Sequence, residues 1–241
     1  MARTASENIA RVTSSRVLGA DACRAGWVGI VLSDEGILAC VHPEISGLVA
    51  LATAAGPLAV IGIDIPIGLA DAGLRQADVL ARKAAGPRWA SVFSTPVRAA
   101  LETVEHHEAS AVNRRLAGCG ISRQAFNLRE KILQVDRWRR QAPSPVVEVH
   151  PELCFGEMAG APLADSKSTW AGAARRRQLL AEAGIVLAGD LGPAGQQAGV
   201  DDVLDAAAVA WTARRVASGT ARRLPAEPER FSDQVDCAIW F

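Results

Sequence analysis

The chain has no excess charge of either sign. Its 241 residues contain 26 Lys and Arg and 26 Asp and Glu, so its formal net charge is +0. Proteins that bind duplex nucleic acid usually show a basic footprint, and no segment here is basic enough to act as a nucleic-acid-binding tail. Lysine is scarce, and arginine occurs in short clusters that are more typical of solvated helix surface than of a phosphate-binding face.

Cysteine motifs and long apolar runs are also lacking. The number of cysteines is odd, their spacing is wide and no C-x-x-C occurs, which argues against a disulfide framework or a zinc site. No run approaches the ~18 apolar residues that a membrane span requires. Residues 1–15 are polar and do not resemble a signal peptide. We therefore expect a cytoplasmic protein without a membrane partner.

What is present is the composition of a globular α/β protein, with 49% hydrophobic and 22% charged residues. Apolar runs separated by turn residues predict an antiparallel meander of strands, followed by a helical crossover into a fourth, parallel strand. A further strand and two long helices follow after an irregular, helix-bearing stretch. The predicted strands are 16–21, 26–33, 37–42, 58–64 and 146–149, and the main predicted helices are 45–55, 77–85, 107–117, 122–141, 169–183 and 201–218.

This order predicts a ribonuclease H-like α/β fold, with a mixed five-stranded sheet flanked by helices. A helical insertion at about 65–145 precedes the fifth strand. We expect a single domain over residues 16–224, a flexible arm at 1–15 and a C-terminal tail at 225–241. The final Trp240 and Phe241 could pack in a homodimer or against their own domain.

Two aspartates follow apolar strands. Asp64 ends the run Leu58–Ile63, which is apolar enough to be buried on both faces, and Pro66 stops the strand just beyond it. Asp21 follows the first strand in the same way. Ligands of open α/β sheets bind at the carboxyl ends of strands, so these two carboxylates predict a site for a hard cation.

Three further acids complete the predicted cluster. Glu148 lies within the strand Val146–Val149, and Asp202 and Asp205 lie three residues apart, on one face of the last long helix. We predict metal ligation by Asp21, Asp64, Asp202 and Asp205, with Glu148 as a further ligand or as the residue that positions water. Alternatively, Glu148 is a surface residue, and the helix acids complement the positive helix end, with Asp201 as its N-cap.

Basic residues near this cluster are candidates for substrate binding. Lys167 precedes a helix and could hold a phosphate, although capping by Ser168 explains the same pattern. Arg75 and Arg98 flank an irregular loop and could line a substrate groove, or they could form simple ion pairs. Among the tryptophans, Trp138 is the candidate for base stacking. His150 could assist proton transfer, but a hydrogen-bonded structural role is favoured.

These motifs resemble the domain-of-unknown-function 429 family, which is described as predicted nucleases of ribonuclease H fold. The resemblance covers residues 17–224 and rests on several segments. These are Gly19-Ala20-Asp21, Gly62-Ile63-Asp64-Ile65-Pro66, Ser91-Val92-Phe93, Glu148-Val149-His150-Pro151-Glu152, Ser166-Lys167 and Asp201-Asp202-Val203-Leu204-Asp205. The acids are also placed similarly to those of RuvC-type resolvases, except that Asp64 stands where those carry glutamate.

The leading hypothesis is a metal-dependent nuclease that hydrolyses phosphodiesters by a two-metal-ion mechanism with Mg²⁺ or Mn²⁺. A nucleic acid or short oligonucleotide would be its substrate. The alternative is a non-catalytic binding or regulatory module of the same fold. An actin-like ATP-handling enzyme is disfavoured, since that class needs two related domains and the chain has no P-loop.

Overall fold

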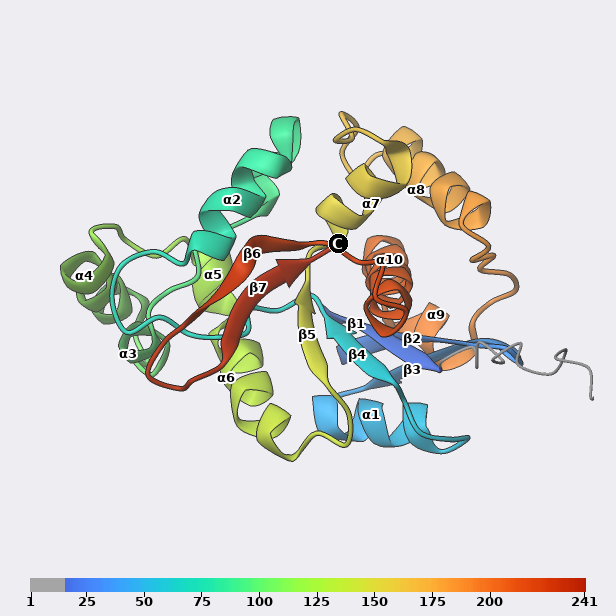
Figure 1. Cartoon of the computed structure of the whole chain (residues 1–241), viewed down its shortest axis with the longest axis horizontal. Helices are drawn as coiled ribbons and strands as arrows, with labels where there is room; N and C mark the ends of the chain where they lie inside the picture. Colours follow the sequence, from blue (N-terminus) through green and yellow to red (C-terminus); the bar gives the residue numbers. More distant parts are fainter. Residues whose placement is uncertain (1–15) are drawn as a thin grey trace, which may run out of the picture.

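A seven-stranded mixed sheet forms the centre of the molecule, in the order β3-β2-β1-β4-β5-β7-β6 (Figure 1). The computed structural model describes residues 16–241, so the predicted arm at 1–15 lies outside the described residues. The strands are Val17–Cys23 (β1), Gly26–Ser33 (β2), Gly36–His42 (β3), Val60–Ile63 (β4), Val146–Val149 (β5), Arg223–Arg230 (β6) and Asp236–Trp240 (β7). The mixed α/β class is therefore confirmed, but the predicted count of five strands is wrong.

The first half of the sheet follows the predicted pairing. β1 pairs antiparallel with β2, and β2 pairs antiparallel with β3. Helix α1 (Ile45–Thr53) then carries the chain over to β4, which lies parallel to β1. Strand β5 extends the sheet on the other side of β4, again in parallel.

The error lies at the C-terminus, where the expected tail contributes β6 and β7. β7 pairs parallel with β5 and antiparallel with β6. Prolines 225 and 228 argue against a regular strand, but β6 is an edge strand with a register shift between Leu224 and Glu229, where proline is tolerated. Trp240 and Phe241 are half-buried, and Phe241 lies under the Arg222 guanidinium, so the chain end packs on its own domain.

Helices occur both between β4 and β5 and after β5. Residues 64–145, between the two strands, hold α2 (Gln76–Ala84), α3 (Arg98–Leu101), α4 (His106–Ala117), α5 (Arg123–Asn127) and α6 (Arg129–Trp138), with 3-10 turns at Gly86–Ser91 and Arg139–Gln141. The predicted helix 122–141 is thus divided into three pieces. After β5 come α7 (Pro151–Ala159), α8 (Trp170–Glu182), α9 (Gly192–Gln197) and α10 (Val200–Ala217).

Apolar side chains bury both faces of the sheet. On one face, Leu18 and Ile61 pack with α1 and α6, whereas Val17 and Val60 on the other face pack with α10. Helix α10 lies unusually close to β1, because a Cβ built on Gly19 would lie 2.0 Å from the backbone nitrogen of Ala210. This close approach fixes the position of α10 over the strands that carry the predicted acids.

Candidate functional site: a carboxylate cluster at the sheet edge

Strand alternation and register bring Asp21 and Asp64 together. Successive side chains in a strand point to opposite faces, so Asp21 shares the α10 face with Gly19, two residues earlier. Gly62 pairs with Gly19 across the parallel β1–β4 ladder, and Asp64 follows Gly62 by the same two-residue step. The Asp64 backbone N–H donates to the Ala20 carbonyl at 2.9 Å, which holds the two aspartates side by side.

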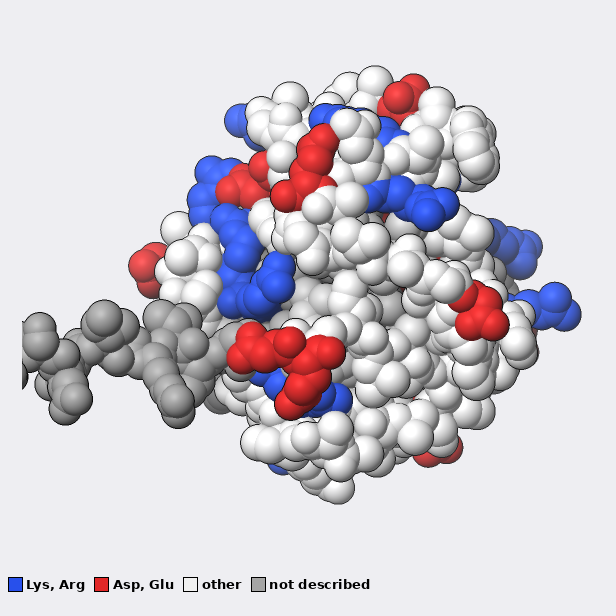
Figure 2. All heavy atoms as spheres, turned by 90° about the vertical axis from the view of Figure 1, so that its right-hand side faces the viewer, with Lys and Arg blue, Asp and Glu red and all other residues white. Residues whose placement is uncertain are grey.

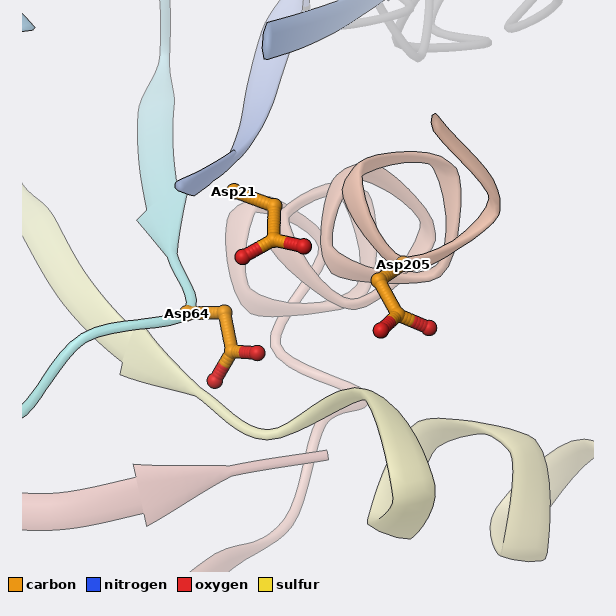
Figure 3. Close-up of side chains that lie close together, drawn as sticks. All are labelled: Asp21, Asp64 and Asp205. Carbon is orange, nitrogen blue, oxygen red and sulfur yellow. The ribbon is translucent and has the colours of Figure 1, made fainter. Parts of the chain in front are cut away.

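Asp205 joins them from α10. It lies one turn before Val209, whose side chain meets Gly62, so the close packing of α10 on the two glycines sets its position. Carboxylate oxygens of Asp21, Asp64 and Asp205 lie within 4.8 Å of one another, and the three side chains converge on one point (Figure 3). The prediction that these acids lie close together is thus confirmed for Asp21, Asp64 and Asp205. We call these three residues the acid triad.

The acid triad is electrostatically strained. Burial raises the pKa of Asp21 well above its ordinary value, and the neighbouring Asp64 and Asp205 raise it further. The pKa of Asp64 rises to about 7, because burial outweighs the opposing effect of Lys167. Asp205 also rises to about 7 for the same two reasons. Three acids that resist ionisation together indicate a site short of positive charge.

Lys167 supplies one positive charge. Its Nζ donates to Asp205 Oδ2 at 2.5 Å and lies 3.8 Å from Asp201 Oδ2. Burial alone would lower the pKa of Lys167, but Asp205 and the other acids raise it above its ordinary value, so the ammonium stays charged. Its side chain is 36% exposed and lines the cleft, where a phosphate would also come within reach.

Asp202 lies near the acid triad but serves the helix end. Its Oδ2 accepts a hydrogen bond from the Gly199 backbone at 3.1 Å, and Gly199, not Asp201, is the N-cap of α10. Asp202 still lines the cleft, so one of its oxygens is available there. It is a peripheral acid and not a member of the converging group.

Glu148 lines the cleft, but its oxygens accept hydrogen bonds from Arg75 and from the Ile67 backbone. This geometry gives no support to the expected metal role of Glu148 or to the expected substrate role of Arg75. Glu148 pairs with Ile63 in the β4–β5 register and therefore shares the face of Ile63, opposite to Asp64. Arg75, which is fully buried, donates to both Glu148 oxygens at 2.7 and 2.9 Å and lies 3.0 Å from Asp78. Buried carboxylates require such partners.

Arg98 is also committed elsewhere. Its guanidinium lies 2.7 Å from Asp136 and 2.9 Å from Asp233, and Arg139 joins the same cluster. The residue is absent from the walls of the cleft. Arg98 therefore ties α3 and α6 to the turn between β6 and β7, and its predicted substrate contact does not fit this placement.

The cleft in front of the acid triad measures about 960 Å³, counted out to its open mouth. One wall comes from Phe93, Gln124 and Leu128 of the segment between β4 and β5. Nothing in the sequence indicated a role for the exposed amide of Gln124. Phe93 was indicated only as part of the Ser91–Phe93 segment. The stretch 64–145 therefore contributes a wall of the site and does not stand apart from it.

His150 and Glu152 line the same cleft in structural roles. His150 is the N-cap of α7, where its Nδ1 accepts from the Glu152 backbone at 3.3 Å, and burial lowers its pKa. Glu152 receives two hydrogen bonds from the buried Arg176, at 2.9 and 2.7 Å. The favoured interpretation of His150 as a hydrogen-bonded histidine agrees with this geometry.

A family match accompanies this geometry. Residues 19–230 match the family described as "Protein of unknown function (DUF429)". The chain belongs to this family. The matched range includes the whole acid triad, Lys167 and the walls of the cleft except Ile239. No curated protein and no solved structure matches the chain, and across residues 16–241 no helix has the length and apolar character to cross a membrane.

Proposed function

We propose that this DUF429 protein is a metal-dependent phosphodiesterase, whose acid triad binds Mg²⁺ or Mn²⁺. The observation that carries the proposal is the convergence of Asp21, Asp64 and Asp205 from β1, the end of β4 and α10. Hard divalent cations in proteins are held by a few carboxylates, with substrate phosphate and water completing the shell.

The partners of the other buried acids in the chain strengthen this assignment. Glu148 is paired with Arg75, Glu152 with Arg176 and Asp136 with Arg98, each at 2.7 Å. The acid triad has no arginine and shares the single charge of Lys167. Burying three carboxylates with one cation is costly unless further positive charge is bound. A divalent cation would supply it.

The chemistry follows from these residues. A bound ion would lower the pKa of a water molecule and polarise the phosphoryl group. Asp21, Asp64 and Asp205 would orient that ion, and Asp202 would serve a second one. Lys167 would neutralise a non-bridging phosphate oxygen. The hydroxide would attack phosphorus, the bond to the leaving oxygen would break, and solvent would return a proton to that oxygen.

The sheet order supports the expected ribonuclease H-like fold. β3-β2-β1-β4-β5 contains three antiparallel strands followed by two parallel ones, which is the layout predicted from the sequence. β6 and β7 extend that sheet. We propose this fold relationship together with the function, since both depend on the same placement of acids.

The mixed charge on the face shown in Figure 2, together with the zero net charge, favours a small or single-stranded substrate over a long duplex. Lys and Arg are intermingled with Asp and Glu on the face shown in Figure 2, with no continuous basic stripe. The formal net charge of +0 agrees with this mixture. A duplex binder would gain little from such a surface, because phosphate neutralisation supplies most non-specific affinity.

The test is hydrolysis of two substrates with Mn²⁺: a fluorescent single-stranded oligonucleotide and bis(p-nitrophenyl) phosphate, which carries no base. We expect turnover of both, and a loss of at least about 100-fold, or about 2.7 kcal/mol, in Asp64→Asn. Asp34→Asn, at an exposed turn, is the matched control. Metal binding without turnover would favour the non-catalytic module, and turnover unaffected by Asp64→Asn would refute the mechanism.

A further inference from the structure

Trp170 is the most exposed large apolar side chain that the structure describes, at 85%. Trp27, by contrast, is fully buried, and Trp138, the predicted stacking candidate, is partly buried against the core. Leaving most of an indole in water forfeits the burial that aromatic side chains ordinarily contribute. An exposed indole beside a candidate active site is available to a ligand.

The surroundings of Trp170 form a groove along α8. Ala173, Ala174 and Arg177 follow at the i+3, i+4 and i+7 positions, so they share one face of the helix with the indole. Val200 and Asp201, at the start of α10, form the opposite wall. The groove measures about 1360 Å³, counted to its open mouth. The two small alanines leave room beside the ring for a planar group.

The groove adjoins the cleft of the acid triad. Lys167 lines both of them, and its Nζ contacts Asp205 within the triad. At the other end, Arg177 is exposed and forms no salt bridge with any of residues 16–241. The seven helical steps from Trp170 to Arg177 rise by about 10 Å, which corresponds to about three stacked bases at roughly 3.4 Å each.

We propose that this groove binds a single-stranded nucleic acid segment next to the bond that is cleaved. An unpaired base stacks on Trp170, and a backbone phosphate lies against Arg177. The chain then passes Lys167 into the acid triad. The inference rests on the proposed function, and it names the substrate class for that site. A duplex cannot offer the face of a base to an indole, so single strands are specified.

The decisive experiment measures binding of a labelled single-stranded octanucleotide by fluorescence anisotropy in EDTA, where no metal takes part. Base–aromatic stacking contributes about 1–3 kcal/mol, so Trp170→Ala should weaken binding by about 5- to 150-fold. Trp89→Ala is the matched control, because Trp89 is 53% exposed, stacks under Arg82 and lies outside both cavities. Its binding should equal that of wild type.

Two further readouts separate this subsite from the catalytic proposal. Arg177→Gln should reduce the salt dependence of binding by about one phosphate contact. Trp170→Ala should lose activity on the oligonucleotide by a much larger factor than on bis(p-nitrophenyl) phosphate, because that short ester has no chain to follow the groove to Arg177. Loss of ester hydrolysis in Asp64→Asn tests the proposed function by itself.

The subsite is refuted if wild type fails to bind the octanucleotide in EDTA, or if Trp170→Ala and Trp89→Ala bind it equally. Binding of the corresponding duplex as tightly as the single strand would also overturn it. A protein that covers Trp170 instead would produce the first of these results. Thermal unfolding of Trp170→Ala should match wild type, since so exposed a side chain contributes little packing.

Discussion

Replacing Asp21 with asparagine should stabilise the metal-free protein. At an effective dielectric constant of about 20, two unit charges about 5 Å apart repel by about 3 kcal/mol, and the three carboxylates lie within 4.8 Å of one another. Lys167 offsets part of this repulsion, and partial protonation limits the rest. We expect Asp21→Asn to raise the free energy of unfolding by about 1–3 kcal/mol at pH 8, or roughly 2–10 °C in Tm.

The pH dependence of this difference follows from the raised pKa values. Asp64 and Asp205 have pKa values of about 7 in the folded protein and about 4 when unfolded. The folded state therefore binds more protons between these values, and its stability falls as the pH rises from about 4 to 7. The advantage of Asp21→Asn should be small near pH 4 and grow as the pH rises, because burial, Asp64 and Asp205 raise the pKa of Asp21 itself. It should reach its full value only once Asp21 is ionised.

Thermal denaturation from pH 4 to 8 in EDTA checks this, with Asp34→Asn as the control at an exposed site. The asparagine can still accept the 2.7 Å hydrogen bond from the Ala22 backbone. The change in stability therefore reports the lost charge and not a lost hydrogen bond. Millimolar Mn²⁺ should raise the Tm of wild type and leave that of Asp21→Asn nearly unchanged. An Asp21→Asn protein less stable than wild type at pH 8 without metal would refute the reasoning.

Three further predictions test the framework around the site. Arg75→Met should cost about 3–5 kcal/mol in urea denaturation, because Glu148 loses its buried partner; a neutral result would show that the pair is dispensable. Gly19→Ala should cost about 2–3 kcal/mol and weaken Mn²⁺ binding in calorimetry, since the new Cβ displaces α10 and with it Asp205. Lys167→Met should tighten Mn²⁺ binding by about 5-fold, because it removes a partly exposed competing cation, yet slow phosphodiester hydrolysis; unchanged values of both would remove Lys167 from the site.

The acid triad was predictable because strand ends and helix spacing are visible in a sequence. The apolar run before Asp64 and the proline after it place Asp64 at the end of a strand. The three-residue spacing of Asp202 and Asp205 places them on one face of a helix. The sequence could not separate the last two. Which of them faces the strands depends on the close packing of α10 on Gly19.

The arginines were not predictable for a different reason. Arg75 is fully buried because Glu148 and Asp78, 73 and 3 residues away, converge on it. No local pattern reveals such a long-range pair, and an isolated arginine is most often exposed. The pairing of Glu148 with Arg75 was not predictable either, because the register of β5 with β4 decides which way Glu148 points.

The C-terminal strands were missed because local signals pointed away from them. Proline usually excludes a strand, yet β6 tolerates two of them at an edge with a register shift. Strand β7 is short, and its pairing with β5 joins segments about 90 residues apart. Tertiary packing decides such strand pairing, and local residue propensities do not predict it.

Binding of a divalent cation by the acid triad can be observed directly in crystals soaked with Mn²⁺. We expect an anomalous peak in contact with carboxylate oxygens of Asp21, Asp64 and Asp205, with Lys167 Nζ moved away from Asp205. Crystals at millimolar Mn²⁺ that show no peak among these oxygens, and Lys167 still bonded to Asp205, would contradict it.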